Sequence, residues 1–403
     1  MFVHLRSASR NYPRQFWIVF VILIINTTAT SFVWPFLTIY FRETLNISLT
    51  GATSLLAIES IATLISTYSL SSLMDKHGRK WIAVGSLAIN GLLFGALILA
   101  KSMPAFIILT ILRGVFNPLF RMGAETMIAD LIKEENRVDA YSLMRVGTNV
   151  GFAVGPIIGG AIVTISYSLD FFISGTVLVL TSVLAAIVLR ETLDKDPEQV
   201  RKTIDKPGIS SSGINVILKD KFFMTFLSGD VLTKMAMILM FSIMSVFLKE
   251  NHGINENQYG WLMAINASMG VVLQMSITKI TKRYNPILMC AVGAFLYVIG
   301  VGSVALGSNY WHFTISVIIA TFAELIFMPT AISVVSRLSP PGMRARYMGF
   351  YSLSFGLSRG ISPLMGGLLN DNISPSAIWL GGALMAAIGS LSFYIISKRM
   401  QNT

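Results

Sequence analysis

Charge is scarce in this sequence: Asp, Glu, Lys and Arg make up 13% of the 403 residues, about half the share found in soluble domains. Cys290 is the single cysteine, which excludes an intramolecular disulfide. No phosphate-binding glycine loop is present, so nothing indicates ATP as an energy source or supports an enzymatic role. Hydrophobic residues reach 54%, and apolar runs long enough to span a bilayer recur throughout. The sequence therefore predicts an all-α membrane protein.

The apolar runs predict twelve transmembrane helices in two bundles of six. The predicted domains are a first bundle over residues 1–190, a cytoplasmic central loop over 191–221 and a second bundle over 222–403. The predicted spans are Gln15–Phe41, Gly51–Met74, Trp81–Ala100, Pro104–Leu131, Ala140–Ile165, Leu169–Leu189, Phe222–Leu248, Gln258–Ile280, Pro286–Leu306, Tyr310–Ser336, Tyr347–Asn370 and Pro375–Ile396.

The basic residues fix the predicted orientation. Of the 31 lysines and arginines, 23 fall in the termini and loops of one side, whereas only Arg42, Lys101 and Lys249 fall on the other. Cytoplasmic loops carry such an excess, so we expect both termini to be cytoplasmic. The net charge of +11 is then a topology signal rather than a nucleic-acid-binding patch. The expected setting is the plasma membrane of a prokaryote, with the protein as a monomer.

The two halves repeat at a constant offset of 207 residues. Arg42-Glu43 returns as Lys249-Glu250, Pro156 as Pro363 and Gly159-Gly160 as Gly366-Gly367. Repeated halves are typical of secondary transporters, whose substrate site lies near the membrane midplane where the halves meet.

The loop after the second predicted helix reads "SSLMDKHGRK". It resembles the loop motif of the major facilitator superfamily through Leu73, Asp75, Lys76, Gly78, Arg79 and Lys80, with Ser71 where glycine is usual. The resemblance implies that this loop latches the outward-facing state, with Asp130 as the partner of Arg79. A turn bearing ordinary positive-inside charges is the alternative.

The fifth predicted helix carries glycines at every fourth position, Gly147, Gly151 and Gly155, which allow close helix packing. Pro156, Gly159 and Gly160 complete a Gly-Pro-x-x-Gly-Gly sequence that resembles the antiporter motif of the same superfamily. The resemblance implies an exporter, and close packing without directional meaning is the alternative. The second half has Ser362 in place of Gly155.

Charged residues also lie inside the spans. Arg113 fits a superfamily arginine on the fourth helix, although Phe116 and Asn117 depart from the residues that usually follow it. Arg121 with Glu125, and Asp230 with Lys234, are spaced i, i+4 and can neutralise each other. For both pairs we favour structural ion pairing over substrate contact, while Asp230 and Glu125 remain candidates for proton coupling.

Glu324 and Glu59 have no obvious partner on their own helices. An ionisable group inside a bilayer is costly and is a functional candidate for that reason. Their repeat counterparts are Asn117 and Asn266, so each half keeps a polar group at these places. Glu324 is the first choice for the coupling proton site and Glu59 the second; a structural acid paired with Arg359 is the alternative.

Aromatic and polar residues outline the expected substrate cavity. An apolar cavity rich in aromatic side chains suits amphipathic ligands. The candidates are Trp34, Tyr40, Arg113, Phe116, Asn117, Phe120, Arg121, Lys234, Asn266, Tyr351, Phe355 and Arg359.

Together these features predict an alternating-access secondary transporter that resembles the twelve-helix drug:proton antiporters. We expect it to export amphipathic small molecules, with the proton gradient as its energy source and no cofactor or resident metal. Na⁺ in place of H⁺ stays open, because a carboxylate serves either ion. The alternatives are a proton-linked importer of an organic anion, a lipid or lysolipid flippase of the same fold, and a non-transporting receptor.

Overall fold

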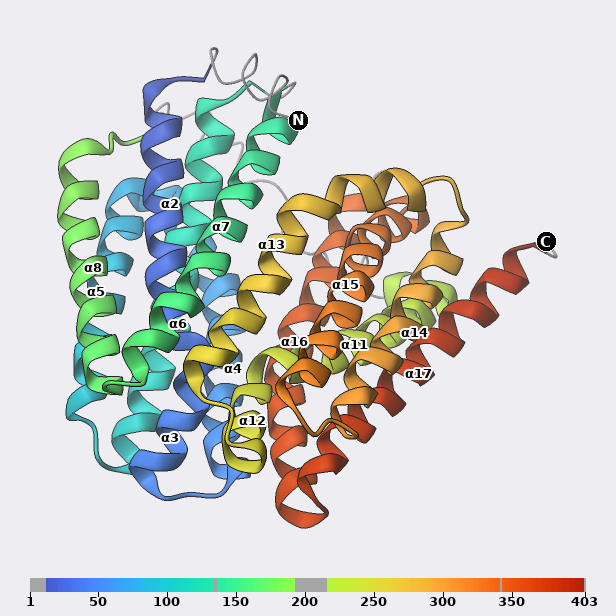
Figure 1. Cartoon of the computed structure of the whole chain (residues 1–403). Helices are drawn as coiled ribbons and strands as arrows, with labels where there is room; N and C mark the ends of the chain where they lie inside the picture. The colour runs from blue at the N-terminus through green and yellow to red at the C-terminus, as the bar shows by residue number, and fades with distance from the viewer. Residues whose placement is uncertain (1–11, 134–135, 193–215, 341–342, 402–403) are drawn as a thin grey trace. The chain divides into compact units, whose positions relative to one another are not determined.

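A computed structural model describes residues 12–133, 136–192, 216–340 and 343–401 (Figure 1). Within these residues the chain is built from helices, and two of the predicted spans are interrupted. The first half comprises α2 (Arg14–Val33), η1 (Trp34–Phe36), α3 (Leu37–Leu45), α4 (Leu49–His77), α5 (Arg79–Leu99), α6 (Met103–Leu131), α7 (Arg137–Val163) and α8 (Tyr167–Val188). The second comprises α11 (Lys221–Ser242), α12 (Met244–His252), α13 (Glu256–Thr281), α14 (Pro286–Val304), α15 (Tyr310–Leu338), α16 (Arg344–Asn372) and α17 (Pro375–Gln401).

The membrane-spanning character of these helices follows from their length and composition. Across the described ranges, eleven helical segments are long and apolar enough to cross a membrane. The remaining predicted span corresponds to α16, which is 29 residues long but carries a row of polar side chains. Its Ser354, Ser358 and Ser362 are all buried, so its polar content is turned into the protein. The predicted all-α, twelve-helix fold class is confirmed.

The first predicted span is not one continuous helix. It breaks at the 3₁₀ turn η1, which contains Pro35. Proline has no N–H to donate and restricts the residue before it, so the chain tightens here before α3 begins. The seventh predicted span also breaks, at Ile243 between α11 and α12, without a local proline or glycine.

The repeat is visible in the helix pairs that pack together. In the first half α2 packs on α7 and α8, and α5 packs on α6 and α8. In the second half α11 packs on α16 and α17, and α14 packs on α15 and α17. These four packed pairs of the second half correspond to those of the first at the 207-residue offset.

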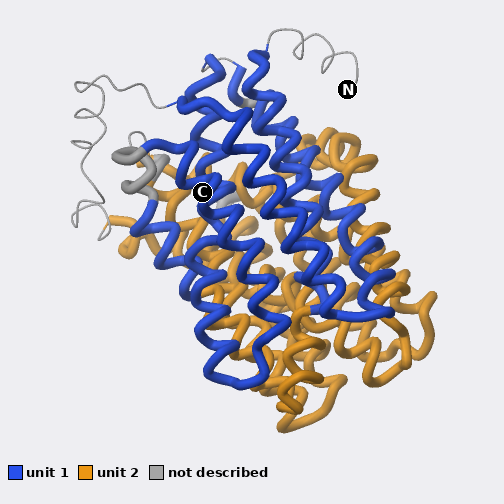
Figure 2. Tube along the Cα trace, turned by 90° about the vertical axis from the view of Figure 1, so that its left-hand side faces the viewer, with its two compact units in different colours: residues 1–36, 61–206 blue, residues 37–60, 207–403 orange. Residues whose placement is uncertain are grey.

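Two compact units divide the chain by packing (Figure 2). One contains residues 1–36 and 61–206, and the other contains residues 37–60 and 207–403. Residues 37–60, which hold α3 and the start of α4, thus pack with the second half of the sequence. Residues 193–215 of the predicted central loop lie outside the described residues, and the predicted division after residue 190 stays a prediction.

Candidate functional site

Glu324 is the central residue of α15 and is half-buried. The side-chain amide of Asn266 on α13 donates to a Glu324 carboxylate oxygen at 3.1 Å and to the Thr321 hydroxyl at 3.0 Å. The structure therefore brings together two of the predicted site residues from different helices. An amide offers both a donor and an acceptor, so Asn266 can hold the ionised carboxylate or, after turning over, the protonated acid.

Glu59 lies on the part of α4 that packs with the second half of the chain, and it is buried. The neighbouring Ser60 packs on α16, where a Cβ added at Gly360 would lie 3.4 Å from the Ser60 Cβ atom. This part of α4 therefore lies next to Gly360 of α16. The roles predicted for Glu59 and Glu324 in proton coupling stay predictions.

The most deeply buried charges of the second unit are Asp230 and Lys234 on α11, whose side chains are 0% and 1% exposed. The Lys234 ammonium donates to Asp230 Oδ2 at 2.6 Å and to the Ser354 hydroxyl of α16 at 2.8 Å. The Ser354 hydroxyl in turn lies 2.6 Å from the same Asp230 oxygen. The ammonium also stands 3.8 Å from the centre of the Tyr351 ring. This cluster holds one positive charge on one carboxylate, as the i, i+4 spacing predicts.

Ser354 was missed by the sequence reasoning, although a signal for it exists. Polar and aromatic residues recur along one face of α16 at spacings of three and four, from Tyr347 to Ser362. The structure turns this face to α11: the Ser358 hydroxyl donates to the Val231 carbonyl at 3.0 Å, and the Ser362 hydroxyl to the Met235 carbonyl at 2.7 Å.

The Arg121–Glu125 pair and Arg113 lie in the first unit and differ from this cluster. Arg121 and Glu125 pair at 2.8 Å, but their side chains are 73% and 44% exposed. Arg113 is buried, with its guanidinium 4.6 Å from the centre of the Phe94 ring. The exposed pair is therefore a surface contact of α6, whereas Arg113 is held inside the first unit.

The predicted cavity residues fall in both compact units. Trp34, Arg113, Phe116, Asn117, Phe120 and Arg121 belong to the first, and Tyr40, Lys234, Asn266, Tyr351, Phe355 and Arg359 belong to the second. Phe120 and Tyr351 are buried, whereas Phe355 is exposed. That these residues line one substrate cavity stays a prediction.

The glycine face of α7 packs against α2. Cβ atoms added at Gly151 and Gly155 would lie 2.9 Å from the Thr27 Cβ atom and from the Thr28 carbonyl oxygen, respectively. At Gly147 an added Cβ would meet the Phe20 ring, and at Gly159 the backbone of Phe32. Pro156 lies inside α7 and Gly160 is buried. The glycines thus permit the close helix contact that the motif predicts; its antiporter meaning stays a prediction.

At the end of the first unit that carries the loop motif, Arg79 forms an ion pair with Asp130, the partner expected from the resemblance. Gly78 has a φ of +94°, which favours glycine. The Asp75 side chain lies outside the described residues. Glu191 was not predicted from the sequence as a site residue. Its carboxylate accepts hydrogen bonds from the backbone N–H groups of Arg79 at 3.0 Å and Lys80 at 3.1 Å. Its carboxylate therefore caps the N-terminus of α5.

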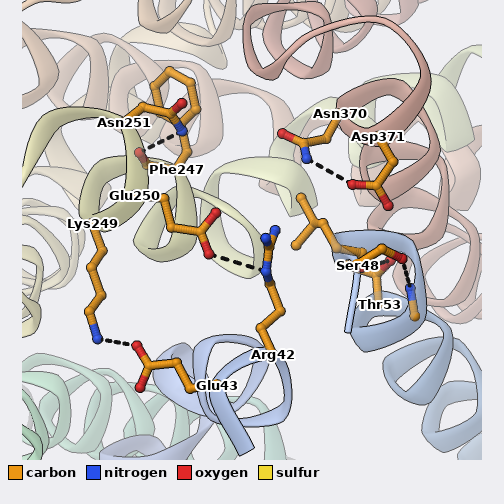
Figure 3. A network of polar contacts seen from close by, with 12 residues as sticks. Arg42, Glu43, Ser48, Thr53, Phe247, Lys249, Glu250, Asn251, Asn370 and Asp371 are labelled. Carbon is orange, nitrogen blue, oxygen red and sulfur yellow. Dashed lines mark hydrogen bonds and ion pairs between the residues drawn. The ribbon is translucent and has the colours of Figure 1, made fainter. Parts of the chain in front are cut away.

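The repeated dipeptides Arg42-Glu43 and Lys249-Glu250 meet in the second unit (Figure 3). Arg42 pairs with Glu250 at 3.1 Å, and the Lys249 ammonium lies 2.5 Å from Glu43 and 2.7 Å from Glu256. Burial lowers the pKa of Lys249, but its hydrogen bonds to Glu256 and Glu43 outweigh that effect and raise the pKa overall. Burial also raises the pKa of Glu250, although the neighbouring Arg42 opposes the shift.

A second contact joins the same segments. The backbone N–H of Thr50 at the start of α4 donates to an Asp371 carboxylate oxygen at the end of α16 at 2.7 Å. Together, the pairs of Arg42, Lys249 and Asp371 form what we call the outer latch, since positive-inside counting predicts the outer side for Arg42 and Lys249. From the sequence, Arg42 and Lys249 served for the topology and for the repeat, and their pairing with Glu250 and Glu43 was not predicted.

Residues 19–247 and 230–401 match the Major Facilitator Superfamily. The chain is 26% identical over 396 residues to the Na(+), Li(+), K(+)/H(+) antiporter of Planococcus maritimus, covering 90% of each protein. It is 22% identical over 335 residues to the multidrug resistance protein MdtH of Aeromonas salmonicida, covering 81% of this chain and 80% of that protein.

Solved structures share the fold at low sequence identity. A POT family transporter in complex with 5-aminolevulinic acid superimposes with a TM-score of 0.80 at 13% identity, covering 96% of each chain. The nucleoside transporter NupG gives a TM-score of 0.77 at 14% identity, covering 96% of this chain and all of that chain. These structures support the fold alone.

Proposed function

Because the chain belongs to the Major Facilitator Superfamily, we propose that it is a proton-coupled antiporter of the plasma membrane that exports amphipathic small molecules. The observation that carries the proposal is the half-buried carboxyl of Glu324 in the middle of α15, hydrogen-bonded to the Asn266 amide. An antiporter and a multidrug resistance protein among its relatives support the same class.

Glu324 is suited to exchange protons with water because it is neither sealed in the core nor fully exposed. An isolated ionised carboxylate inside a bilayer is costly, so taking up a proton lowers the cost of the state in which the group is enclosed. Asn266 can hydrogen-bond the acid in both protonation states. Proton uptake from outside and release to the cytoplasm would then drive the export of a solute in the opposite direction.

A second substrate class, the monovalent metal cations, is favoured by the relative that exchanges Na⁺, Li⁺ and K⁺ for H⁺. The buried carboxylate of Asp230 offers an anionic partner of the kind such ions need. The proton gradient can drive the export of amphipathic small molecules and of monovalent metal cations alike, because each would leave in exchange for an entering proton.

Transport in proteoliposomes under an imposed proton gradient tests the proposal. The wild-type protein should drive uptake of a lipophilic cationic dye into vesicles that are acidic inside, and Glu324→Gln should lose that flux while keeping its folding and its dye binding. Asp139→Asn, an exposed acid at the start of α7, is the matched control and should transport like the wild type. Full flux in Glu324→Gln at equal incorporation would remove Glu324 from the mechanism.

Competition experiments separate this function from the other transporter classes. Inhibition of dye flux by hydrophobic cations supports the antiporter, whereas inhibition by organic anions or lysolipids alone points to the importer or flippase. No gradient-driven flux of the dye in the wild type would overturn the proposed export of amphipathic cations.

A further inference from the structure

Tyr297 on α14 carries a buried hydroxyl that the proposed mechanism does not yet use. Its side chain is 1% exposed, and its hydroxyl oxygen has no hydrogen-bond partner among the residues that the structure describes. The hydroxyl of a buried tyrosine usually finds a partner, and a buried polar group left without one costs free energy. The hydroxyl of Tyr297 therefore favours a state of the protein in which a neighbouring group accepts its hydrogen.

The packing of α14 on α15 fixes the direction in which Tyr297 points. A Cβ atom added at Gly293 would lie 2.9 Å from the Phe327 Cβ atom, and one added at Gly300 would lie 2.8 Å from the Ala320 backbone nitrogen. Seven residues separate these two contacts on each helix, and they follow in opposite order, so the helices are antiparallel in a single register. Tyr297 lies on the same face of α14, four residues after the first contact and three before the second. Its side chain therefore faces α15.

Ala323 and Glu324 are the residues of α15 at this level. Four residues back from Phe327, the register places Ala323 opposite Tyr297, and Ala323 is 0% exposed. Glu324 follows, turned by about 100° around the helix, and accepts from the Asn266 amide of α13 at 3.1 Å. Glu324 is also the charged group that acts electrostatically on the Tyr297 hydroxyl. The hydroxyl and the carboxyl thus lie side by side in the second unit.

Other titratable groups lie on the helices that pack on α15. These helices are α11, α13, α14 and α16, and α13 contributes the amide of Asn266, which does not titrate. The titratable side chains in the middle parts of the other three are Tyr297 and Cys290 on α14, Asp230 and Lys234 on α11, and Tyr351 and Arg359 on α16. Asp230 and Lys234 neutralise each other, and Cys290 lies near that pair. Tyr297 combines a hydroxyl without a hydrogen-bond partner with a place in the electrostatic range of Glu324.

We propose that Tyr297 is a positioning residue of the proton site, whose hydroxyl donates a hydrogen bond to the ionised Glu324 carboxylate and withdraws it when the carboxyl takes up a proton. The ionised carboxylate then accepts from Asn266 and Tyr297 together, whereas Asn266 alone holds the protonated acid. A hydrogen bond to the charged form of an acid favours that form. Tyr297 thus helps Glu324 to release its proton, a step that a carboxyl inside a membrane otherwise resists.

The role of Tyr297 rests on the proposed function for the part that Glu324 plays, but its test requires no transport. Infrared spectroscopy of the full-length protein in detergent follows the carboxyl directly. The difference between the spectra of the wild type and Glu324→Gln, recorded over the pH range in which both stay folded, isolates the carbonyl band of the protonated Glu324. The pH at which half of this band is lost is the titration midpoint.

Tyr297→Phe removes the hydroxyl and keeps the ring. Its titration midpoint, measured against the double variant Tyr297→Phe with Glu324→Gln, should move to higher pH by about one to two units, because a hydrogen bond to a charged group is lost. Tyr394→Phe on α17 is the matched control, since it removes the hydroxyl of an exposed tyrosine, and it should titrate like the wild type.

A double-mutant cycle separates this role from a merely structural one. The hydrogen bond is made to the ionised carboxylate, so it stabilises the fold above the titration midpoint, and its contribution is lost as the pH falls through that midpoint. At high pH, Tyr297→Phe should therefore lower the midpoint of thermal unfolding when Glu324 is present and leave it unchanged in the Glu324→Gln background. Equal losses in the two backgrounds would mean that the hydroxyl serves another group, and would overturn the proposal.

The results also separate Tyr297 from the export of amphipathic solutes. An unchanged titration midpoint in Tyr297→Phe would overturn the role of Tyr297, even if the wild type transports the dye and Glu324→Gln does not. A shifted midpoint together with no dye flux in the wild type would keep the role of Tyr297 and overturn the proposed export. If no titrating band is lost in Glu324→Gln, then Glu324 takes up no proton in the folded protein, and both proposals are overturned.

Discussion

The Lys249 ammonium of α12 lies 2.5 Å from a Glu43 carboxylate oxygen of α3, and the residues next to them, Glu250 and Arg42, pair in the opposite sense. The two dipeptides are copies of one another at the 207-residue offset. A basic-acidic dipeptide that meets its own copy around a pseudo-twofold axis makes two reciprocal salt bridges, as in an isologous interface. The repeated dipeptide thus supplies both partners of each of these two salt bridges.

The first prediction concerns this outer latch. Arg42→Glu places an acid against Glu250, and Glu250→Arg places a base against Arg42, so each variant should separate the segments joined by the outer latch more often. The variant that carries both changes restores opposite charges and should close like the wild type. Thr53 is buried on α4 beside Gly367 of α16, so Thr53→Cys in a Cys290→Ala background reports opening by its reaction rate with an impermeant thiol reagent. Partly exposed pairs contribute about 0–1 kcal/mol each, so the single variants should raise the rate up to about fivefold.

The combined swap is the control for this experiment. If the double variant reacts as fast as either single variant, the charges act independently and the pairing of Arg42 with Glu250 does not hold the outer end closed.

The second prediction concerns the cap on α5. Glu191→Ala removes the acceptor of the Arg79 and Lys80 N–H groups and should lower the free energy of unfolding of the first unit by about 0.5–2 kcal/mol. Glu191→Gln keeps one carbonyl acceptor and should lose less. The midpoint of thermal unfolding in detergent measures both effects. An unchanged midpoint in Glu191→Ala would show that water can replace the carboxylate as the hydrogen-bond acceptor for the N–H groups of Arg79 and Lys80.

Most of the fold could be predicted because its signals are local. Apolar runs give the spans and the 207-residue offset gives the repeat, and neither requires a distant contact. The break at Ile243 shows what escapes such reasoning. Near it, the Ser242 carbonyl accepts from the Thr38 hydroxyl at 3.3 Å, and the Met240 carbonyl accepts from Tyr259 at 3.4 Å. Backbone groups freed by the break are thus satisfied by residues far away in the sequence.

The site was predictable to the same extent. The i, i+4 spacing was enough to pair Asp230 with Lys234, because both lie on one helix. Their third partner, Ser354, lies 120 residues beyond Lys234, and Glu191 lies 112 residues beyond Arg79. The periodic polar face of α16 indicates that Ser354 points into the protein, but which helix it meets depends on tertiary packing, as does the contact of Glu191.

The third prediction concerns the close contact of α7 with α2. An added Cβ at Gly151 would lie 2.9 Å from the Thr27 side chain and 3.1 Å from the Thr28 backbone nitrogen, so Gly151→Ala requires the helices to separate. We expect a loss of about 1–3 kcal/mol, as for other overpacked positions. Gly95→Ala on α5 is the matched control, because no atom lies within 4 Å of its added Cβ.

The two glycine variants should move in opposite directions. Gly95→Ala should be neutral or stabilising by up to about 1 kcal/mol, since alanine favours the helix. The midpoint of thermal unfolding measures both, and equal midpoints for Gly151→Ala and the wild type would mean that α2 and α7 separate without cost.

The last prediction concerns Asp170 in the first turn of α8, which the sequence reasoning passed over. Its side chain is fully buried, and neither carboxylate oxygen has a hydrogen-bond partner among the residues that the structure describes. Burying a polar group without a hydrogen bond costs free energy, and burying a charge costs more. Asp170→Asn keeps the shape and removes the charge, so its midpoint of unfolding should equal or exceed that of the wild type. Asp170→Ala, which leaves a cavity, is the control and should be less stable than Asp170→Asn. A clear loss of stability in Asp170→Asn would instead mean that the carboxylate itself is bound in the folded protein, and a search for its partner should then begin at Ser174, the buried hydroxyl one turn further along the same helix.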